Sequence, residues 1–360
     1  MALPTKTKTW QFLWNNLTGS TGAIATDASS LFYNLSVKLL ALRNAVDGSG
    51  NPSGGTAIFT CQGSSNGTTA GMDAVNRWSS ASQVNFTNNA YNSWIVLRNG
   101  GSGLTNPYYL LVVPYLATGI YYGYFAISYS GFTGGSTTAL PTATDLFVLA
   151  GNNVAAANTL TTQGVCVQPT TAYIGKLHVI ASIDGTSVRW AHSSNGITQM
   201  MYCVEQPTQT PSAWANPLVV FNNGSVAYSA SWTANCATTA ALFTTSNCVS
   251  IRGNPNPLAA SPLLPQPVVG FLTTEYYNGA TLAGTETLPS DLDGTWPLCN
   301  IGVASFSTIG YRGRLGVMAD MWQGASNAGD LTTYPQDATR QFVQFQNLVW
   351  PDNGTIVQAS

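Results

Sequence analysis

The stretch KLHVIASIDGTSVRWAH, residues 176–192, contains the clearest indication of the fold. Asp184-Gly185 in its middle is a dipeptide that favours a two-residue turn between antiparallel strands. With that turn, Ile183 lies opposite Thr186, and Leu177 lies opposite His192. The stretch therefore predicts a β-hairpin with one apolar face. We expect that face to carry Leu177, Val179, Ala181, Ile183, Val188 and Trp190.

The same register determines on which face of the sheet each of the two histidines in the chain lies. His178 lies opposite Ala191, so His178 and His192 point to opposite faces of the predicted sheet. A site built from both histidines is therefore excluded. We expect His178 to be a solvated strand residue and His192 to lie at the edge of the core.

Short apolar or aromatic runs recur on both sides of this hairpin, separated by clusters of Gly, Asn, Pro and Ser. This pattern is typical of an antiparallel sandwich or barrel. The expected strands are 56–61, 93–98, 108–113, 120–128, 145–149, 177–183, 188–192, 217–221, 268–273, 302–309 and 342–348. We therefore predict a mainly β fold, an antiparallel β-sandwich or jelly-roll-like architecture with an N-terminal arm and one long helix.

The long helix is predicted to begin at a cap on Asp27 and to continue to Val46, before DGSGNPSGG stops it. Its apolar side chains recur at spacings of three and four residues, as one face of a helix requires. They are Ala28, Leu31, Phe32, Leu35, Leu39, Leu42 and Val46. Two shorter helices are expected at 70–78 and near Asp337.

An aromatic stripe precedes the helix. In an extended strand, Trp10, Phe12 and Trp14 share one face and present a large apolar surface. Such a strand either packs on its own domain or adds to the sheet of a neighbouring subunit. We expect residues 1–52 to form an attachment module and residues 53–360 to form the β-sandwich region, as one unit or as two sub-domains. The expected interface residues are Trp10, Phe12, Trp14, Leu31, Phe32 and Leu35.

The charge content is unusual. Of 360 residues, 7% are charged and the net charge is −2, against about 25% charged residues in ordinary globular proteins. No charge lies between Arg98 and Asp145, and only Arg252 lies between Glu205 and Glu275. Phosphate binding needs a basic surface, so nucleic acid is excluded as a partner. Because charge keeps soluble monomers apart, we infer that neighbouring protein covers much of this neutral surface, as in a homo-oligomer such as a trimer.

Residues 108–128, YYLLVVPYLATGIYYGYFAIS, are long enough to cross a membrane as a helix. Pro114, Gly119 and Gly123 interrupt the segment, and four of its six tyrosines lie inside it rather than at its ends. Two strands fit better, and no membrane contact is expected. The N-terminus lacks the apolar core of a signal peptide, so we expect synthesis and assembly in a cytoplasm.

The candidates for chemistry are weak. The six cysteines form no C-x-x-C pair, so neither a metal nor another cofactor is expected. Residues 63–67 match G-x-S-x-G, which would make Ser65 a nucleophile, but the surrounding pattern lacks the alternating helices of a hydrolase. Asp291, Asp293 and Asp320 could supply the two carboxylates of a depolymerase. We expect a protein that is not an enzyme.

Several phrases together resemble uncharacterised virion structural proteins of tailed bacteriophages. They lie near both ends and in the first third of the chain: KTWQ (8–11), GSSNGTTAGMDAVNRW (63–78), SWIVLR (93–98), RGRLGVMADMW (312–322), RQFVQF (340–345) and WPDNG (350–354). The resemblance implies a component of the virus particle and assigns no catalytic residue.

These observations favour a non-enzymatic virion structural protein that contacts the major capsid or tail proteins. It would decorate or cement the outside of the head, or repeat elsewhere in the particle. The alternative is a tail or fibre protein that binds glycans of the host surface. Tyr121, Tyr122 and Tyr124 would then supply the aromatic platform for the sugar.

Overall fold

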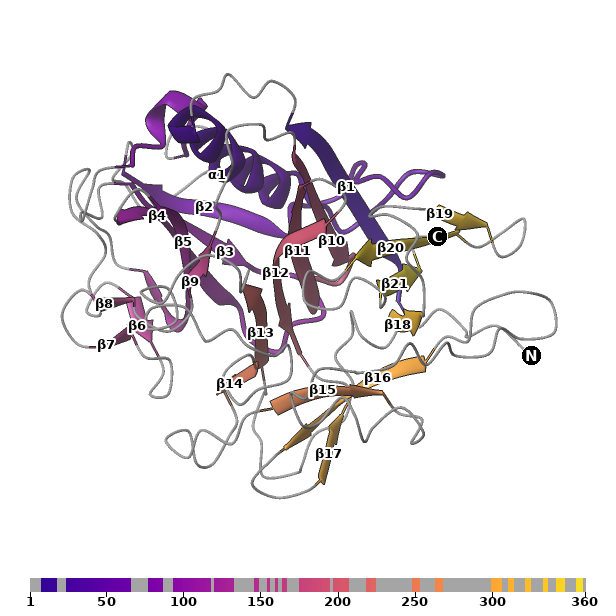
Figure 1. Cartoon of the computed structure of the whole chain (residues 1–360). Coiled ribbons are helices and arrows are strands. Elements are labelled where there is room, and N and C mark those ends of the chain that lie inside the picture. Colours follow the sequence, from indigo (N-terminus) through magenta and orange to yellow (C-terminus); the bar gives the residue numbers. More distant parts are fainter. Residues whose placement is uncertain are drawn as a thin grey trace, which may run out of the picture.

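The structure is a computed structural model of the chain (Figure 1). It describes residues 8–17, 24–65, 77–86, 93–117, 120–132, 146–148, 154–155, 159–160, 164–166, 175–194, 197–206, 218–224, 248–252, 263–267, 299–305, 310–313, 321–324, 333–335, 341–346 and 354–358. Most of these residues are in antiparallel strands, accompanied by one α-helix, which confirms the mainly β class.

Two antiparallel sheets enclose the core. The first has the strand order β1 (Trp10–Leu17), β10 (Gly175–Ser182), β11 (Ser187–Ser194), β12 (Ile197–Glu205), β13 (Leu218–Gly224) and β14 (Cys248–Arg252). The second has the order β2 (Phe59–Ser64), β3 (Ile95–Asn99), β4 (Tyr108–Ala117), β5 (Ile120–Phe132) and β6 (Leu146–Val148), and β9 (Gly164–Cys166) also pairs with β5.

The remaining strands lie outside these two sheets. A further sheet in the C-terminal part contains β15 (Leu263–Pro267), β16 (Cys299–Ser305), β17 (Gly310–Gly313), β18 (Met321–Gly324), β19 (Thr333–Pro335), β20 (Gln341–Gln346) and β21 (Gly354–Gln358). The short strands β7 (Val154–Ala155) and β8 (Thr159–Leu160) pair with each other.

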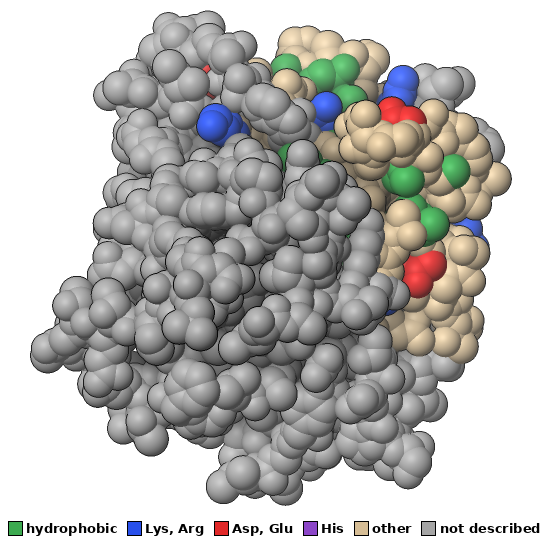
Figure 2. All heavy atoms as spheres, turned by 90° about the vertical axis from the view of Figure 1, so that its right-hand side faces the viewer, with side chains coloured by type: hydrophobic (Ala, Val, Ile, Leu, Met, Phe, Trp, Pro, Cys, Tyr) green, Lys and Arg blue, Asp and Glu red, His purple; other side chains and the backbone are tan. Residues whose placement is uncertain are grey.

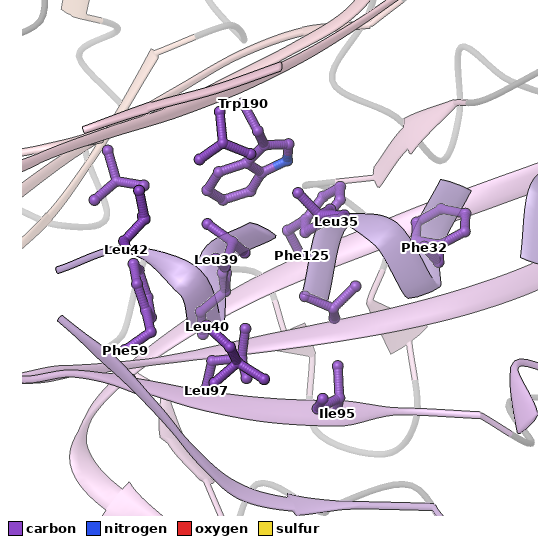
Figure 3. Close-up of a cluster of buried hydrophobic side chains, with 14 of the residues drawn as sticks. Phe32, Leu35, Leu39, Leu40, Leu42, Phe59, Ile95, Leu97, Phe125 and Trp190 are labelled. Atoms are coloured by element: carbon purple, nitrogen blue, oxygen red, sulfur yellow. The ribbon is translucent and has the colours of Figure 1, made fainter. Parts of the chain in front are cut away.

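The helix α1 (Ile24–Ala41) contacts both core sheets, lying against β2 on one side and β1 and β10 on the other (Figure 1). Its apolar face enters the space between them. In Figure 3, Leu35 and Leu39 lie between Trp190 of β11 and the strand that carries Ile95 and Leu97. All five of these side chains are buried, and each such burial contributes about 1.5–3 kcal/mol.

The predicted face of the helix is confirmed, but both predicted ends are wrong. The helix begins at Ile24, so Asp27 lies in its first turn and does not cap it. It ends at Ala41, because the chain then becomes extended: Arg43 pairs with Ala57 and Val46 pairs with Pro52. Asp47 stabilises the reversal between these bridges, since its Oδ1 accepts the backbone N–H groups of Ser49 and Asn51.

The core crosses the boundary expected at residue 52. Trp10 of β1 is buried, and β1 pairs along its whole length with β10, from Trp10 opposite Ser182 to Leu17 opposite Gly175. The α1 side chains share one apolar cluster with strands from β2 to β12. The first 52 residues therefore contribute both an edge strand and the central helix to the β structure that follows them.

The register of the 176–192 hairpin is confirmed, with Leu177 opposite His192 and His178 opposite Ala191. The turn is longer than predicted. The strands end at Ser182 and Ser187, and the N–H of Gly185 donates to the carbonyl of Ser182 across the turn at 3.0 Å. Residues 108–117 and 120–128 form strands, as expected, within β4 and β5. β12 was not predicted, and the expected strand 268–273 and the expected helices at 70–78 and near Asp337 lie mostly or wholly outside the described residues.

The contact between α1 and β5 leaves no room for a side chain at Gly123. A Cβ atom there would overlap the ring of Phe32. That ring is fully buried and lies 5.7 Å from the ring of Phe86 and 6.5 Å from that of Phe125, measured between centroids. Phe32 therefore cannot move aside freely.

We predict that Gly123→Ala lowers the free energy of unfolding by about 1–3 kcal/mol, because overpacking strains a filled core. Gly48→Ala is the matched control, since a Cβ at Gly48 meets no atom within 4 Å. Urea denaturation of the full chain measures both variants. Equal stabilities of the two variants would contradict this account of the core.

Candidate functional site

Polar side chains of the described residues meet where the turn between β10 and β11 packs on the loop between β3 and β4. We call this cluster the hairpin-tip network. Its members are Lys8, Asn99, Ser182, Asp184, Thr186 and Ser187. The network joins the two core sheets and the segment that leads into β1.

Two glycines bring the backbones of the turn and the loop together. A Cβ atom on Gly101 would lie 2.5 Å from both the carbonyl oxygen of Asp184 and the Cα of Gly185. Gly185 also has a φ of 74°, which side-chain-bearing residues rarely adopt. Next to this contact, the N–H of Gly103 donates to the carbonyl of Asp184 at 2.8 Å. Only glycine fits on both sides.

The side chain of Asn99 joins the turn and the loop through hydrogen bonds. Its Nδ2 donates to the carbonyl of Gly185 and to the hydroxyl of Tyr108, each at 3.0 Å. Its Oδ1 accepts the N–H of Gly101 at 2.9 Å. Asn99 is fully buried, so each of these bonds satisfies a group that water does not reach.

Asp184 orders the turn itself. Its Oδ1 accepts the hydroxyl of Ser182, the hydroxyl of Thr186 at 2.7 Å and the backbone N–H of Thr186 at 3.0 Å. Burial alone would raise the pKa of Asp184, but these hydrogen bonds and the positive charge of Lys8 outweigh it and hold the pKa below its ordinary value. The carboxylate is therefore ionised at neutral pH.

Lys8 connects the network to the N-terminal strand. Its Nζ donates to the hydroxyl of Thr186 and, at 3.0 Å, to the hydroxyl of Ser187. The N–H of Ile183 donates to the carbonyl of Thr9 at 3.0 Å. The start of β1 is thus held against the tip of the hairpin by both side-chain and backbone bonds.

A second anchor lies one residue into β1. The side-chain amide of Gln11 donates to the carbonyl of Arg43 at 2.6 Å and accepts the N–H of Arg43 at 2.8 Å. This pair of bonds imitates one step of a β-ladder. It couples β1 to the chain that leaves α1, so β1 is held by the buried side chain of Gln11 as well as by its ladder with β10.

The geometry of these groups suits anchoring and not nucleophilic catalysis. A catalytic hydroxyl must reach its substrate, whereas Ser182 and Ser187 are fully buried. The ammonium group of Lys8 is itself engaged, because it donates to the hydroxyls of Thr186 and Ser187. The network therefore holds β1 in place.

Ser65, the other candidate nucleophile, is also buried. Its Oγ accepts the indole N–H of Trp78 at 3.2 Å, and its own N–H donates to the carbonyl of Trp94 at 2.9 Å. It follows β2, which pairs antiparallel with β3, whereas a nucleophile elbow exposes its serine after a strand of a parallel sheet. Asp291, Asp293 and Asp320 lie outside the described residues.

The structure agrees with the expectation for one histidine and contradicts it for the other. His192 is buried, consistent with a place at the core. The expectation that His178 is solvated is wrong: its side chain is 2% exposed, with the ring of Phe12 stacked 6.5 Å away. Arg189 shares that side of the sheet in the confirmed register and is buried too, so this second face is covered.

Burial also determines the charge of both histidines. It lowers the pKa of His178 well below its ordinary value, with the positive charges of Arg189 and Lys176 adding to the effect. Burial lowers the pKa of His192 to about 3. Both imidazoles are therefore neutral at neutral pH.

The remaining predicted site residues occupy two places. Leu31, Phe32 and Leu35 are core residues of this chain, with Trp10 buried in β1 and Trp14 opposite His178 in the register. On β5, Tyr121 pairs with Leu116 of β4, while Tyr122 and Tyr124 pair with Cys166 and Gly164 of β9. Sequence reasoning did not identify Lys8, Gln11 or Asn99, because each binds residues distant in the sequence.

We predict that Asn99→Ala lowers the free energy of unfolding by about 1–3 kcal/mol, because it leaves buried polar groups of Gly101 and Gly185 without a partner. Asn106→Ala, at an exposed position, is the control and should change stability by less than about 0.5 kcal/mol. Thermal unfolding followed by circular dichroism compares them. A loss for Asn99→Ala no larger than that of the control would contradict the anchoring role.

The free energy of unfolding should also decrease as the pH is lowered. His178 and His192 have lowered pKa values in the folded state, so the unfolded chain binds more protons below about pH 6.5, and acid favours unfolding. Asp184, whose pKa is also lowered, adds a further loss below about pH 4.

We therefore expect the free energy of unfolding in urea to decrease from about pH 7 to about pH 5. The variant with both His178→Gln and His192→Gln should show a smaller decrease over that interval. A free energy of unfolding that stays constant or rises as the wild-type chain is acidified would contradict the prediction.

Among the described residues, no helix is long and apolar enough to cross a membrane, and no three His, Cys, Asp or Glu side chains lie close enough together to hold a metal ion. In comparisons with known proteins, no family model, no curated protein and no solved structure matches the chain.

Proposed function

We propose that this chain is a non-enzymatic structural protein of a bacteriophage particle, repeated on the exterior of the head as a decoration or cement protein. The observation that carries the proposal is the neutral sequence. Residues 99–144 hold no charged side chain, and charged residues are 7% of the whole chain. A surface of this kind is suited to lasting contact with other protein, because its burial does not remove charges from water.

The tight packing of the described part fits a building block. The two core sheets are joined by backbone contact at Gly101 and Gly185, by Asn99 and by the central helix. Ser65, Ser182 and Ser187, the serines considered above as nucleophiles, are buried. We propose that the two sheets form a sandwich of jelly-roll type, the architecture found in many viral capsid proteins. The resemblance of the six sequence phrases to virion proteins points in the same direction.

The partners in this proposal are further copies of the chain and the major capsid or tail proteins. Synthesis and assembly take place in the host cytoplasm. Neutral contacts are only weakly screened by salt, so such a particle would tolerate changes in ionic strength.

The second candidate is a receptor-binding protein of the tail. It is favoured by the tyrosines of β5, where positions 122 and 124 alternate with Gly123 and Phe125 of the core. Aromatic faces and neutral hydrogen-bonding groups are suited to sugars. The two candidates require very different numbers of copies in one particle.

We predict that quantitative mass spectrometry of purified particles gives a ratio of about one, or about one third, to the major capsid protein, as symmetric decoration requires. A few copies per particle would favour receptor binding in its place. Particles that lack the chain would refute both candidates.

A further inference from the structure

β1 lies in a groove that is formed entirely by later parts of the chain. One wall is the edge of β10, which pairs with all eight residues of β1. Further contacts come from Thr186 and Ser187 toward Lys8 and from the backbone of Arg43 toward Gln11. On α1, the side chain of Asn34 accepts a hydrogen bond from that of Asn15 at 2.9 Å. Trp10 is buried at one end of the strand. The groove therefore recognises this particular segment through its backbone, an aromatic side chain, an amide and an ammonium group.

The topology allows β1 to leave this groove without disturbing another strand. Among the described elements it comes first in the chain and is an edge strand, and β10 is the one described strand that pairs with it. Residues 18–23, TGSTGA, separate it from α1. Six residues span at most about 20 Å, so β1 could reach the groove of an adjoining copy but not that of a more distant one.

Moving β1 from one copy to another would also cost little free energy. No charged residue lies between Lys8 and Asp27, so the one charge that moves when β1 passes from one groove to another is that of Lys8, which would donate to the same two hydroxyls in the new groove. Identical grooves offer identical contacts. A short linker provides an effective concentration of the order of millimolar, which neighbouring copies in a closely packed shell also provide.

We propose that β1 of one copy occupies the β1 groove of a neighbouring copy, so that the N-terminal strand links subunits by strand exchange. This inference rests on the proposed function, because it is the repeated placement of copies in a particle that brings the grooves together. The partner is a second copy of this chain. The contacts described within one chain then form between chains, which makes exchange a low-cost route to assembly.

The test uses the register between Asn16 and Lys176. Paired residues of antiparallel strands have Cα atoms about 4.5–5.5 Å apart, which permits a disulfide. Two full-length single variants, Asn16→Cys and Lys176→Cys, are co-expressed, so that the chains fold together, and the purified assembly is oxidised. A disulfide between positions 16 and 176 can then form only between two chains. We expect covalent dimers on a non-reducing gel, with the linked peptides identified by mass spectrometry.

A matched mixture of Lys176→Cys and Ser193→Cys is the control. Positions 176 and 193 pair within the hairpin of β10 and β11, whose strands cannot exchange through the link before α1, so this mixture should give no dimer joined at these positions. A chain that carries both Asn16→Cys and Lys176→Cys is the positive control. It forms the 16–176 disulfide whether β1 comes from its own chain or from a neighbouring one.

The absence of a 16–176 dimer from the first mixture overturns strand exchange, and so does an equal yield from the control mixture. These results are independent of the copy number in the particle. A chain that is abundant in the particle but keeps β1 in its own groove would retain the proposed function and lose this inference. A chain that is absent from the particle but still forms the dimer would lose the proposed function and retain this inference.

Discussion

The burial of one helix face between two antiparallel sheets is the constraint on which the rest of the described structure depends. Leu35 and Leu39 fill the space between Trp190 and β3, and Phe32 fills the space beside Gly123. Because α1 contacts β1, β10 and β2, it determines how the edge strands of the two sheets are placed. Gln11 and Arg43 then join β1 to the chain that follows the helix. β1 and α1 for this reason contribute buried side chains to the same core as the strands that follow them.

Sequence patterns were sufficient where a signal lies within a few consecutive residues. The hairpin register followed from alternation around Asp184-Gly185, and the buried face of α1 followed from helical spacing. The ends of the helix did not follow, because the pairing of Arg43 with Ala57 competes with a further helical turn. β12 was missed because its sequence ITQMMYCVE does not alternate cleanly between apolar and polar residues. Its neighbours β11 and β13, one on each side, specify it instead.

The anchoring residues were harder to identify for the same reason. Asn99 acts on Gly185, and Lys8 acts on Thr186 and Ser187, so their roles depend on contacts between distant parts of the chain. His178 shows the converse error. Its place on the polar side of a hairpin indicated solvent, but tertiary packing covers that side as well. A two-stranded pattern cannot reveal whether a second layer lies on its outer face. On the face in Figure 2, the described part of the surface is mostly tan, the colour of the backbone and of the remaining side chains, with Lys, Arg, Asp and Glu side chains scattered over it.

The bridged segment between α1 and β2 has a practical consequence. Its two bridges, Arg43 with Ala57 and Val46 with Pro52, close a short ladder whose tip carries the exposed residues Asp47, Gly48 and Ser49. The ends of this loop are fixed by their own pairing, so a foreign peptide inserted at its tip would interrupt neither core sheet. In a protein repeated over a shell, that tip would display the inserted epitope in as many copies as the shell contains.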